Sequence, residues 1–387
     1  MLVCKSKFVF LFGIILFFGG CIVSKKNVVA PDAIVIASLH YLGEKDIPYN
    51  FLYNNTTVGG LSGIDYDAVA KNYYLISDDR SALNPARFYT ASIAFTQAGI
   101  DSIKFTGVHF LLQPVGNSYP NTATDRYHTP DPESIRYNPF TKKLWWTSEG
   151  ERIISAKDTV LEDPAINVVS TDGRFLDSII IPDNLRMQAM EKGPRQNGVF
   201  EGLTFADNYK NIFVSVEEPL YEDGPRVDVT DKNTFIRILK FNAANKKNIA
   251  QYAYKPDNIA YAAIPADKFK INGIPDILYL GNNKMLVLER SYSTGHLNCT
   301  IKVFIADLNQ ATDITNLPLK NNAGKFTPIS KKLLLNMDEL GIYIDNIEGV
   351  TFGPDLPNGH KTLLFIADNN FSSSQVSQLL LFEVNQF

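Results

Sequence analysis

From residue 33 onwards, the chain consists almost entirely of short apolar runs separated by turns rich in Gly, Asn, Asp and Pro. Runs of this length and spacing predict β-strands, and few stretches have the 3.6-residue period of an amphipathic helix. Short helices are expected only near residues 265–270 and 337–340, as insertions in loops. The pattern predicts an all-β protein.

One two-strand unit recurs five times along the chain. Each copy opens with a polar or acidic residue, followed by an apolar strand, a polar turn and a second apolar strand that ends in an acid. LSGIDYDAVAKNYYLISDD and FEGLTFADNYKNIFVSVEE are two of the copies. The opening residues lie 71, 68, 75 and 72 positions apart, and they are Ser62, Glu133, Glu201, Asp276 and Glu348. A period this regular predicts a repeat architecture.

A second pair of strands is expected after each of the first four hairpins. These pairs are 88–95 with 102–108, 167–171 with 175–181, 235–241 with 248–254, and 300–307 with 332–335. After the fifth hairpin only the strand 378–384 remains, and residues 33–42 would supply its missing partner. A blade shared between the two ends closes a β-propeller without an exposed edge. We therefore predict five four-stranded blades, or six if a long connection such as 110–126 or 219–232 hides further strands.

The repeat also arranges acidic residues in two columns. The start of the first strand and the end of the second lie at the same end of an antiparallel hairpin, so both columns should converge on one mouth. The second column comprises Asp78, Glu149, Glu217, Glu289 and Asp368. With the opening residues, carboxylates occupy nine of the ten equivalent positions.

Nine carboxylates around one opening would repel one another, and burial of an unpaired charge is costly. Neighbouring arginines (Arg80, Arg152 and Arg290), shared protons or hard metal ions could offset that cost. The excess of oxygen ligands, without a cluster of His or Cys, favours Ca²⁺ over zinc. The alternative is a structural role, in which the acids accept hydrogen bonds from the backbone of neighbouring blades.

The metal hypothesis names a ligand set and a smaller set of catalytic candidates. The expected ligands are Asp78, Glu133, Glu149, Glu201, Glu217, Asp276, Glu289, Glu348 and Asp368. The catalytic candidates are Glu201, Glu217, Arg80 and Arg290. Other chemistry finds little support: the five histidines have no paired spacing, and Ser62 lies in GLSG, which lacks the full G-x-S-x-G elbow.

The first twenty residues have the pattern of an export signal. Lys5 and Lys7 precede the apolar run 8–18, which is too short for a membrane span of ~20 residues but suits a secretory signal. The residues Gly-Gly-Cys ending at Cys21 resemble a bacterial lipoprotein signal, in which the cysteine carries lipid. The expected organisation is a signal peptide over 1–20, a tether over 21–32 and a domain over 33–387. The protein would be lipid-anchored in the cell envelope, or secreted if it is not lipidated.

The charge and the cysteines limit the partners and the means of stabilisation. The formal net charge is −4 and would be −6 without residues 1–20, which argues against a nucleic-acid partner. Cys4 would leave with the signal and Cys21 would carry lipid, so Cys299 would have no disulfide partner. Stability must then come from packing, and a monomer is expected.

Several repeat segments resemble the phytase-like family, which is described as having the esterase-like activity of phytase. They are DPESIRYNP, FEGLTF with the following SVEE, and IEGVTFGP with FIADN, and the resemblance runs from about residue 59 to 384. It implies a secreted or membrane-attached bacterial propeller related to proteins that hydrolyse phosphate esters with calcium. The family's E-G/S-x-x-F/Y positions fall on Glu133, Glu201 and Glu348, whereas Ser62 and Asp276 depart from Glu.

Three functions are compatible with these observations. The first is a Ca²⁺-dependent hydrolase acting on a small-molecule substrate that carries phosphate, with the arginines stabilising developing charge. The second is a metal-dependent esterase or lactonase, whose neutral substrates need no arginines. The third is a non-catalytic propeller that binds a ligand or scaffolds an envelope complex.

Overall fold

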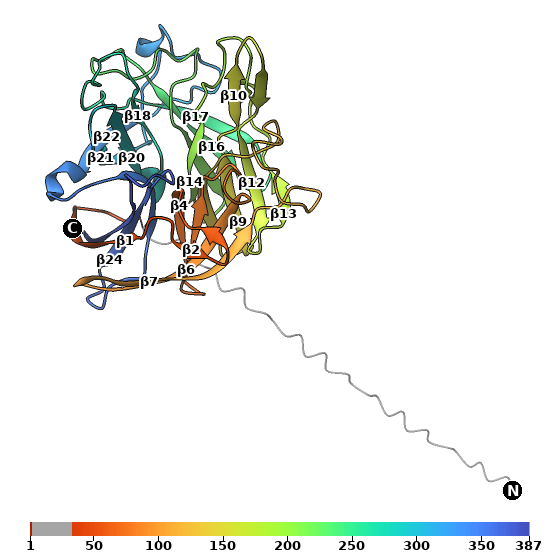
Figure 1. The fold of residues 1–387 in the computed structure, drawn as a ribbon, viewed down its shortest axis with the longest axis vertical. Coiled ribbons are helices and arrows are strands. Elements are labelled where there is room, and N and C mark those ends of the chain that lie inside the picture. Colours follow the sequence, from red (N-terminus) through yellow and green to blue (C-terminus); the bar gives the residue numbers. More distant parts are fainter. Residues whose placement is uncertain (2–32, 387) are drawn as a thin grey trace. The chain divides into compact units, whose positions relative to one another are not determined.

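The computed structural model describes residue 1 and residues 33–386, and residues 33–386 lie in one compact unit (Figure 1). The expected signal peptide (1–20), the lipidated Cys21 and the tether (21–32) fall outside the described residues. No helix among the described residues is long and apolar enough to cross a membrane.

Five antiparallel blades of four strands each form the unit, with one further strand paired to blade four, and their innermost strands contact one another in a closed ring. Blade one is β4 (Leu61–Asp67), β5 (Asn72–Ser77), β6 (Arg87–Thr96) and β7 (Gly99–Phe110). Blade two is β8 (Pro132–Asn138), β9 (Lys143–Ser148), β12 (Ala165–Ser170) and β13 (Phe175–Ser178). Blade three is β14 (Phe200–Ala206), β15 (Asn211–Val216), β16 (Ile236–Asn242) and β17 (Asn248–Tyr254). Blade four is β19 (Ile277–Gly281), β20 (Lys284–Ser293), β21 (Thr300–Asp307) and β22 (Ser330–Asn336). Blade five is β23 (Asn346–Phe352), β24 (Lys361–Asp368), β25 (Ser377–Asn385) and β1 (Ser38–Ile47). The predicted five-bladed propeller is confirmed.

The N-terminal strand closes the last blade, as predicted, but it lies further along the chain than residues 33–42. β1 pairs with β25 from Ser38 opposite Asn385 to Ile47 opposite Ser377. The preceding residues cross blade four instead, where the N–H of Ile34 donates to the carbonyl of Leu280 at 2.7 Å. The long connection 110–126 begins at the last residue of β7 and, like 219–232, adds no further strand, so the six-bladed alternative is wrong.

Several local elements were not predicted, whereas the short helix expected at 337–340 is present. The hairpin β10 (Glu151–Ile154) and β11 (Thr159–Glu162) follows β9, and β2 (Leu52–Tyr53) with β3 (Thr56–Thr57) precedes blade one. The segment 337–340 forms the 3-10 helix η3, while η1 (Asp183–Leu185) and η2 (Ala323–Lys325) are shorter still. Residues 265–270 form no helix. Their end begins β18 (Lys270–Gly273), whose backbone pairs with β20 instead.

Apolar faces of adjacent blades pack together around the ring. One core joins Trp145 of blade two, Phe213 of blade three and Val287 of blade four, and further cores join the remaining pairs of blades. Side chains alternate across each strand, so the apolar alternation read from the sequence supplies both faces of every blade. Packing of this kind holds the strand ends that carry the carboxylates.

A buried ion pair ties the inner strands of all five blades together. Arg136 on β8 donates to the carbonyl oxygens of Leu203 (2.6 Å) and Ile64, in blades three and one. It also pairs with Asp276 of blade four at 2.7 Å. Asp276 in turn accepts the N–H of Val350 in blade five at 2.8 Å. The centre of the propeller is therefore filled by polar contacts deeper along the inner strands than the mouth.

Candidate metal centre

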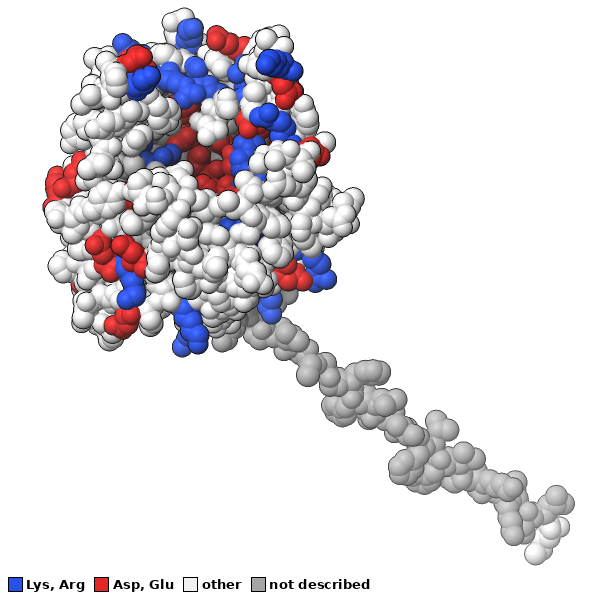
Figure 2. All heavy atoms as spheres, in the orientation of Figure 1, with Lys and Arg blue, Asp and Glu red and all other residues white. Residues whose placement is uncertain are grey.

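One mouth of the propeller opens into a cavity of ≈ 990 Å³. Figure 2 shows the hollow, with carboxylate side chains deep inside it and Lys and Arg side chains around its rim. Arg226 and Arg290 are the only Lys or Arg residues among the described residues that line it. Its carboxylates are Asp78, Asp131, Glu133, Glu149, Glu201, Glu217, Asp345, Glu348 and Asp368.

Seven of the nine predicted acids line this cavity, and the strand register explains their position. In blades one, two, three and five, the first strand has a β-bulge at its opening residue, as between Phe200 and Leu203 in β14. A bulge re-aims the side chain that it contains, which here turns Glu133, Glu201 and Glu348 into the mouth. Ser62 has no carboxylate and donates to the carbonyl of Glu133 at 2.7 Å.

Blade four departs from the prediction, because the repeat pattern placed its residues one position away from their true counterparts in the other blades. Ile277 pairs with Val287 as Leu203 pairs with Val214. Counting from these pairs makes Pro275 the counterpart of Glu201, and Arg290 the counterpart of Glu217. This blade therefore contributes a guanidinium where the other four contribute carboxylates.

The two acids of blade four thus lie outside the cavity and outside the carboxylate groups described below, and each has another partner. Asp276 is the partner of Arg136 in the buried pair at the propeller centre. Glu289 accepts hydrogen bonds from the Tyr254 hydroxyl at 2.7 Å and the Asn272 amide at 2.9 Å, and it pairs with Lys331. The two acids are 13 residues apart, against 16 for the paired positions in the first three blades, and this difference could have revealed the shift in register.

Sequence reasoning missed Asp131, which lies two residues before Glu133 and at the equivalent of Val199 in blade three. Its backbone carbonyl accepts the N–H of Glu149 at 2.9 Å, and its carboxylate joins those of Glu133 and Glu149. Arg80 lies behind it, 3.1 Å from Asp131 and 2.9 Å from Glu151. The sequence Asp131-Pro132-Glu133 places this second acid close to the repeat position, so the sequence could have identified it.

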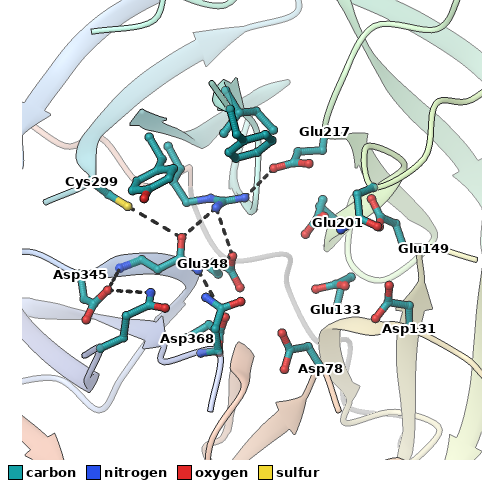
Figure 3. Close-up of a pocket in the computed structure, with 18 of the residues that line it drawn as sticks. Asp78, Asp131, Glu133, Glu149, Glu201, Glu217, Cys299, Asp345, Glu348 and Asp368 are labelled. Carbon is teal, nitrogen blue, oxygen red and sulfur yellow. Dashed lines mark hydrogen bonds and ion pairs between the residues drawn. The ribbon is translucent and has the colours of Figure 1, made fainter. Parts of the chain in front are cut away.

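The carboxylates form three groups, in each of which oxygen atoms of all three members lie within 4.8 Å of one another. Figure 3 shows these side chains projecting from several blades toward a common space. Glu149 belongs to two groups and so connects them. The groups are Asp78 with Glu348 and Asp368, Asp131 with Glu133 and Glu149, and Glu149 with Glu201 and Glu217.

Arg290 lies between the first and third groups. Its guanidinium is 2.6 Å from Glu217, 3.6 Å from Glu348 and 2.8 Å from the Asn346 side-chain oxygen. Arg152, by contrast, donates to the carbonyl of Gln188 at 2.9 Å and does not line the cavity. Of the three arginines singled out in the sequence, only Arg290 faces the carboxylates from inside the cavity.

Burial and mutual repulsion raise the pKa values of the clustered acids. Loss of solvation is the largest cause, followed by neighbouring carboxylates, and together they raise the pKa values of Asp78, Glu133, Glu149 and Glu201 well above the ordinary range. Burial also raises the pKa of Glu348 to about 8, although Arg290 opposes the shift.

This donor set fits a divalent cation. Three groups made only of carboxylate oxygens match the hard-ligand preference of Ca²⁺. Cys299 and His296 also line the cavity, but burial raises the pKa of the Cys299 thiol to about 12 and so keeps it protonated. The carboxylate groups could therefore hold a metal ion through oxygen ligands alone.

The raised pKa values predict how the metal-free protein responds to pH. An acid whose pKa is raised by folding stabilises the folded state below its ordinary pKa, and this contribution is lost as the pH rises through the folded value. Between pH about 4.5 and about 8, the range for Glu348, the free energy of unfolding with EDTA should rise on acidification. Urea denaturation should show a gain of roughly a few kcal/mol from pH 7.5 to 5.5, since one pKa unit is about 1.4 kcal/mol.

Calcium should reverse this dependence. At pH 7.5, saturating calcium should stabilise the protein more than at pH 5.5, because protonated carboxylates bind the ion poorly. If the EDTA-treated protein were less stable at pH 5.5 than at 7.5, the carboxylates would not repel one another as the geometry requires.

One family model matches most of the described chain. A family model described as "Phytase-like: Esterase-like activity of phytase" matches residues 56–371. No curated protein matches the chain.

Solved structures with a similar fold have little sequence in common with this chain. The α-L-arabinofuranosidase from Lactobacillus brevis is 11% identical with a TM-score of 0.45, and the match covers 84% of this chain and 91% of that one. An N-acetylgalactosamine deacetylase from F. plautii is 9% identical with a TM-score of 0.46, over 90% and 96%. A gluconolactonase from Xanthomonas campestris is 8% identical with a TM-score of 0.36, over 92% and 99%. At these scores the structural similarities carry no argument about function.

Proposed function

We propose that this chain, which belongs to the phytase-like family, is a Ca²⁺-dependent hydrolase of phosphate esters anchored in the cell envelope. The observation that carries the proposal is the set of three carboxylate groups around one cavity with Arg290 between two of them. The envelope location rests on the apolar run 8–18 and on Cys21 in the sequence.

The carboxylates would hold calcium through all three groups, with Glu149 shared by two. Bound calcium would supply positive charge for a phosphate ester and lower the pKa of water. Without that charge the acidic cavity would repel phosphate, so activity depends on the ion.

Two residues of the cavity would act on the substrate directly. The Nη atoms of Arg290 would donate hydrogen bonds to phosphate oxygens and stabilise the charge that develops there. Glu201 has a raised pKa and lies beside Glu149 and Glu217. As water attacks phosphorus and the P–O bond to the alcohol breaks, the Glu201 carboxylate would take a proton from the water and pass it to the departing alcohol oxygen.

Hydrolysis of p-nitrophenyl phosphate should therefore require calcium. We expect turnover in millimolar calcium and background rates in EDTA, with activity restored when calcium is added back. Rates at background in both conditions would contradict the phosphoesterase function.

A specific observation also favours a metal-dependent esterase or lactonase. Both guanidiniums that line the cavity are already paired, Arg290 with Glu217 and Glu348, and Arg226 with Glu218. A neutral ester would not need to compete for them. A panel of aryl esters and lactones under the same calcium conditions distinguishes the two functions.

A further inference from the structure

Blade four rises above the mouth further than its neighbours. β20 has ten residues, whereas β15 and β24 of the two neighbouring blades have six and eight. Its last four residues pair with β18, from Lys270 opposite Ser293 to Gly273 opposite Arg290. Together with the flanking residues 269 and 294–297, this two-stranded extension forms a flap at the cavity edge.

The cavity side of the flap is apolar above Arg290. Side chains alternate along a strand, so Arg290 and Tyr292 share a face of β20, and Ile271 stands directly opposite Tyr292 on β18. Phe269 and Leu297 continue this surface toward solvent, and the rings of Phe269 and Tyr292 lie 6.2 Å apart. We call Phe269, Ile271, Tyr292 and Leu297 the apolar wall.

Gly273, the last residue of β18, lets the flap lie close to the carboxylates where it joins blade four. A Cβ at this position would lie 2.4 Å from the Cγ of Glu217, so only glycine allows both to occupy this space. The flap thus places the apolar wall on the same cavity as the third carboxylate group.

The outer part of the apolar wall, Phe269 and Leu297, is open to solvent, whereas Ile271 is buried. Leu297 is 91% exposed and Phe269 is 56% exposed, yet both line the cavity. Clustered apolar groups that stay exposed beside polar groups mark ligand-binding surfaces, and pockets of 300–1,000 Å³ accept small organic molecules. A cavity of ≈ 990 Å³ has room for much more than a phosphate group.

We propose that the apolar wall binds an apolar or aromatic alcohol portion of the substrate, while the carboxylate groups and Arg290 face the bond that is hydrolysed. This inference rests on the proposed function and names its substrate class: esters of apolar or aromatic alcohols, rather than phosphates of polyols.

The test compares 1-naphthyl phosphate with glycerol 2-phosphate in calcium. The wild-type protein should prefer the naphthyl ester in kcat/KM, and the variant Phe269→Ser/Leu297→Ser should lose at least about 10-fold of that preference. Both side chains are exposed, so their replacement should leave the fold intact. The matched control is Leu176→Ser/Ile180→Ser, which removes exposed side chains that do not line the cavity and should leave the preference unchanged.

A binding measurement separates this inference from the proposed function. The intrinsic fluorescence of 1-naphthol reports its equilibrium binding without turnover, and the wall variant should weaken that binding at least about 5-fold. If no phosphate ester is hydrolysed but 1-naphthol binding responds in this way, the subsite stands and the phosphoesterase function fails. Equal 1-naphthol binding by the wild type and the wall variant would overturn the subsite, whatever the activity.

Discussion

Replacing Arg136 with methionine should lower the free energy of unfolding by about 3–5 kcal/mol, because the buried carboxylate of Asp276 loses its partner. Both side chains are almost completely buried, at 3% and 1% exposure. The change also removes the donors to backbone carbonyls in blades one and three. Equilibrium urea denaturation measures the loss.

Two further variants show whether the buried pair is the cause. Arg174→Met removes an exposed pair with Asp172 and should cost less than about 1 kcal/mol. Arg136→Met/Asp276→Leu replaces both charges with apolar groups and should recover part of the loss, although the carbonyls of Ile64 and Leu203 still lack their donor. An Arg136→Met variant as stable as Arg174→Met would show that the pair does not hold the blades together.

The fold was predictable from the sequence because the repeat is a packing requirement. Each blade needs two apolar faces to pack against its neighbours, so the alternation returns with every blade, and the last blade needs the N-terminal strand to avoid a free edge. The bounds of that strand were wrong because Ile34 donates its backbone hydrogen bond to Leu280 of blade four, a contact between distant segments, and the regular pairing with β25 begins only at Ser38. The extension β18 was missed for the same reason: only its partner β20 makes it a strand.

The candidate site was predictable where it follows the repeat and not where one blade departs from it. Seven acids were found because the hairpin geometry alone brings strand ends together. In blade four, Glu289 was matched with the acids that end the second strand of the other hairpins. The pairing of Ile277 with Val287 places Arg290 at that position instead. The division into three groups depends on the radial position of each strand end, which only the folded ring determines.

Replacing Glu149 with glutamine should have the largest effect on metal binding, because Glu149 alone belongs to two carboxylate groups. Calcium affinity measured by isothermal titration calorimetry should fall by well over about 10-fold, since even outer-shell residues contribute 10–100-fold. Hydrolysis in calcium that saturates only the wild type should fall by at least about 100-fold. Glutamine can still accept the N–H of Val199, which Glu149 accepts at 2.8 Å.

The stability of the same variant distinguishes a metal ligand from a structural acid. Removing one charge from a repelling cluster should make the metal-free protein more stable at pH 7.5, by about 1–2 kcal/mol. Glu289→Gln is the matched control: this acid is equally buried but lies outside the cavity and binds Lys331. It should lose about 1–3 kcal/mol of stability and keep its calcium affinity. If Glu149→Gln destabilised the metal-free protein and Glu289→Gln weakened calcium binding, the ion would not lie among the three groups, and the mouth acids would hold the blades together instead.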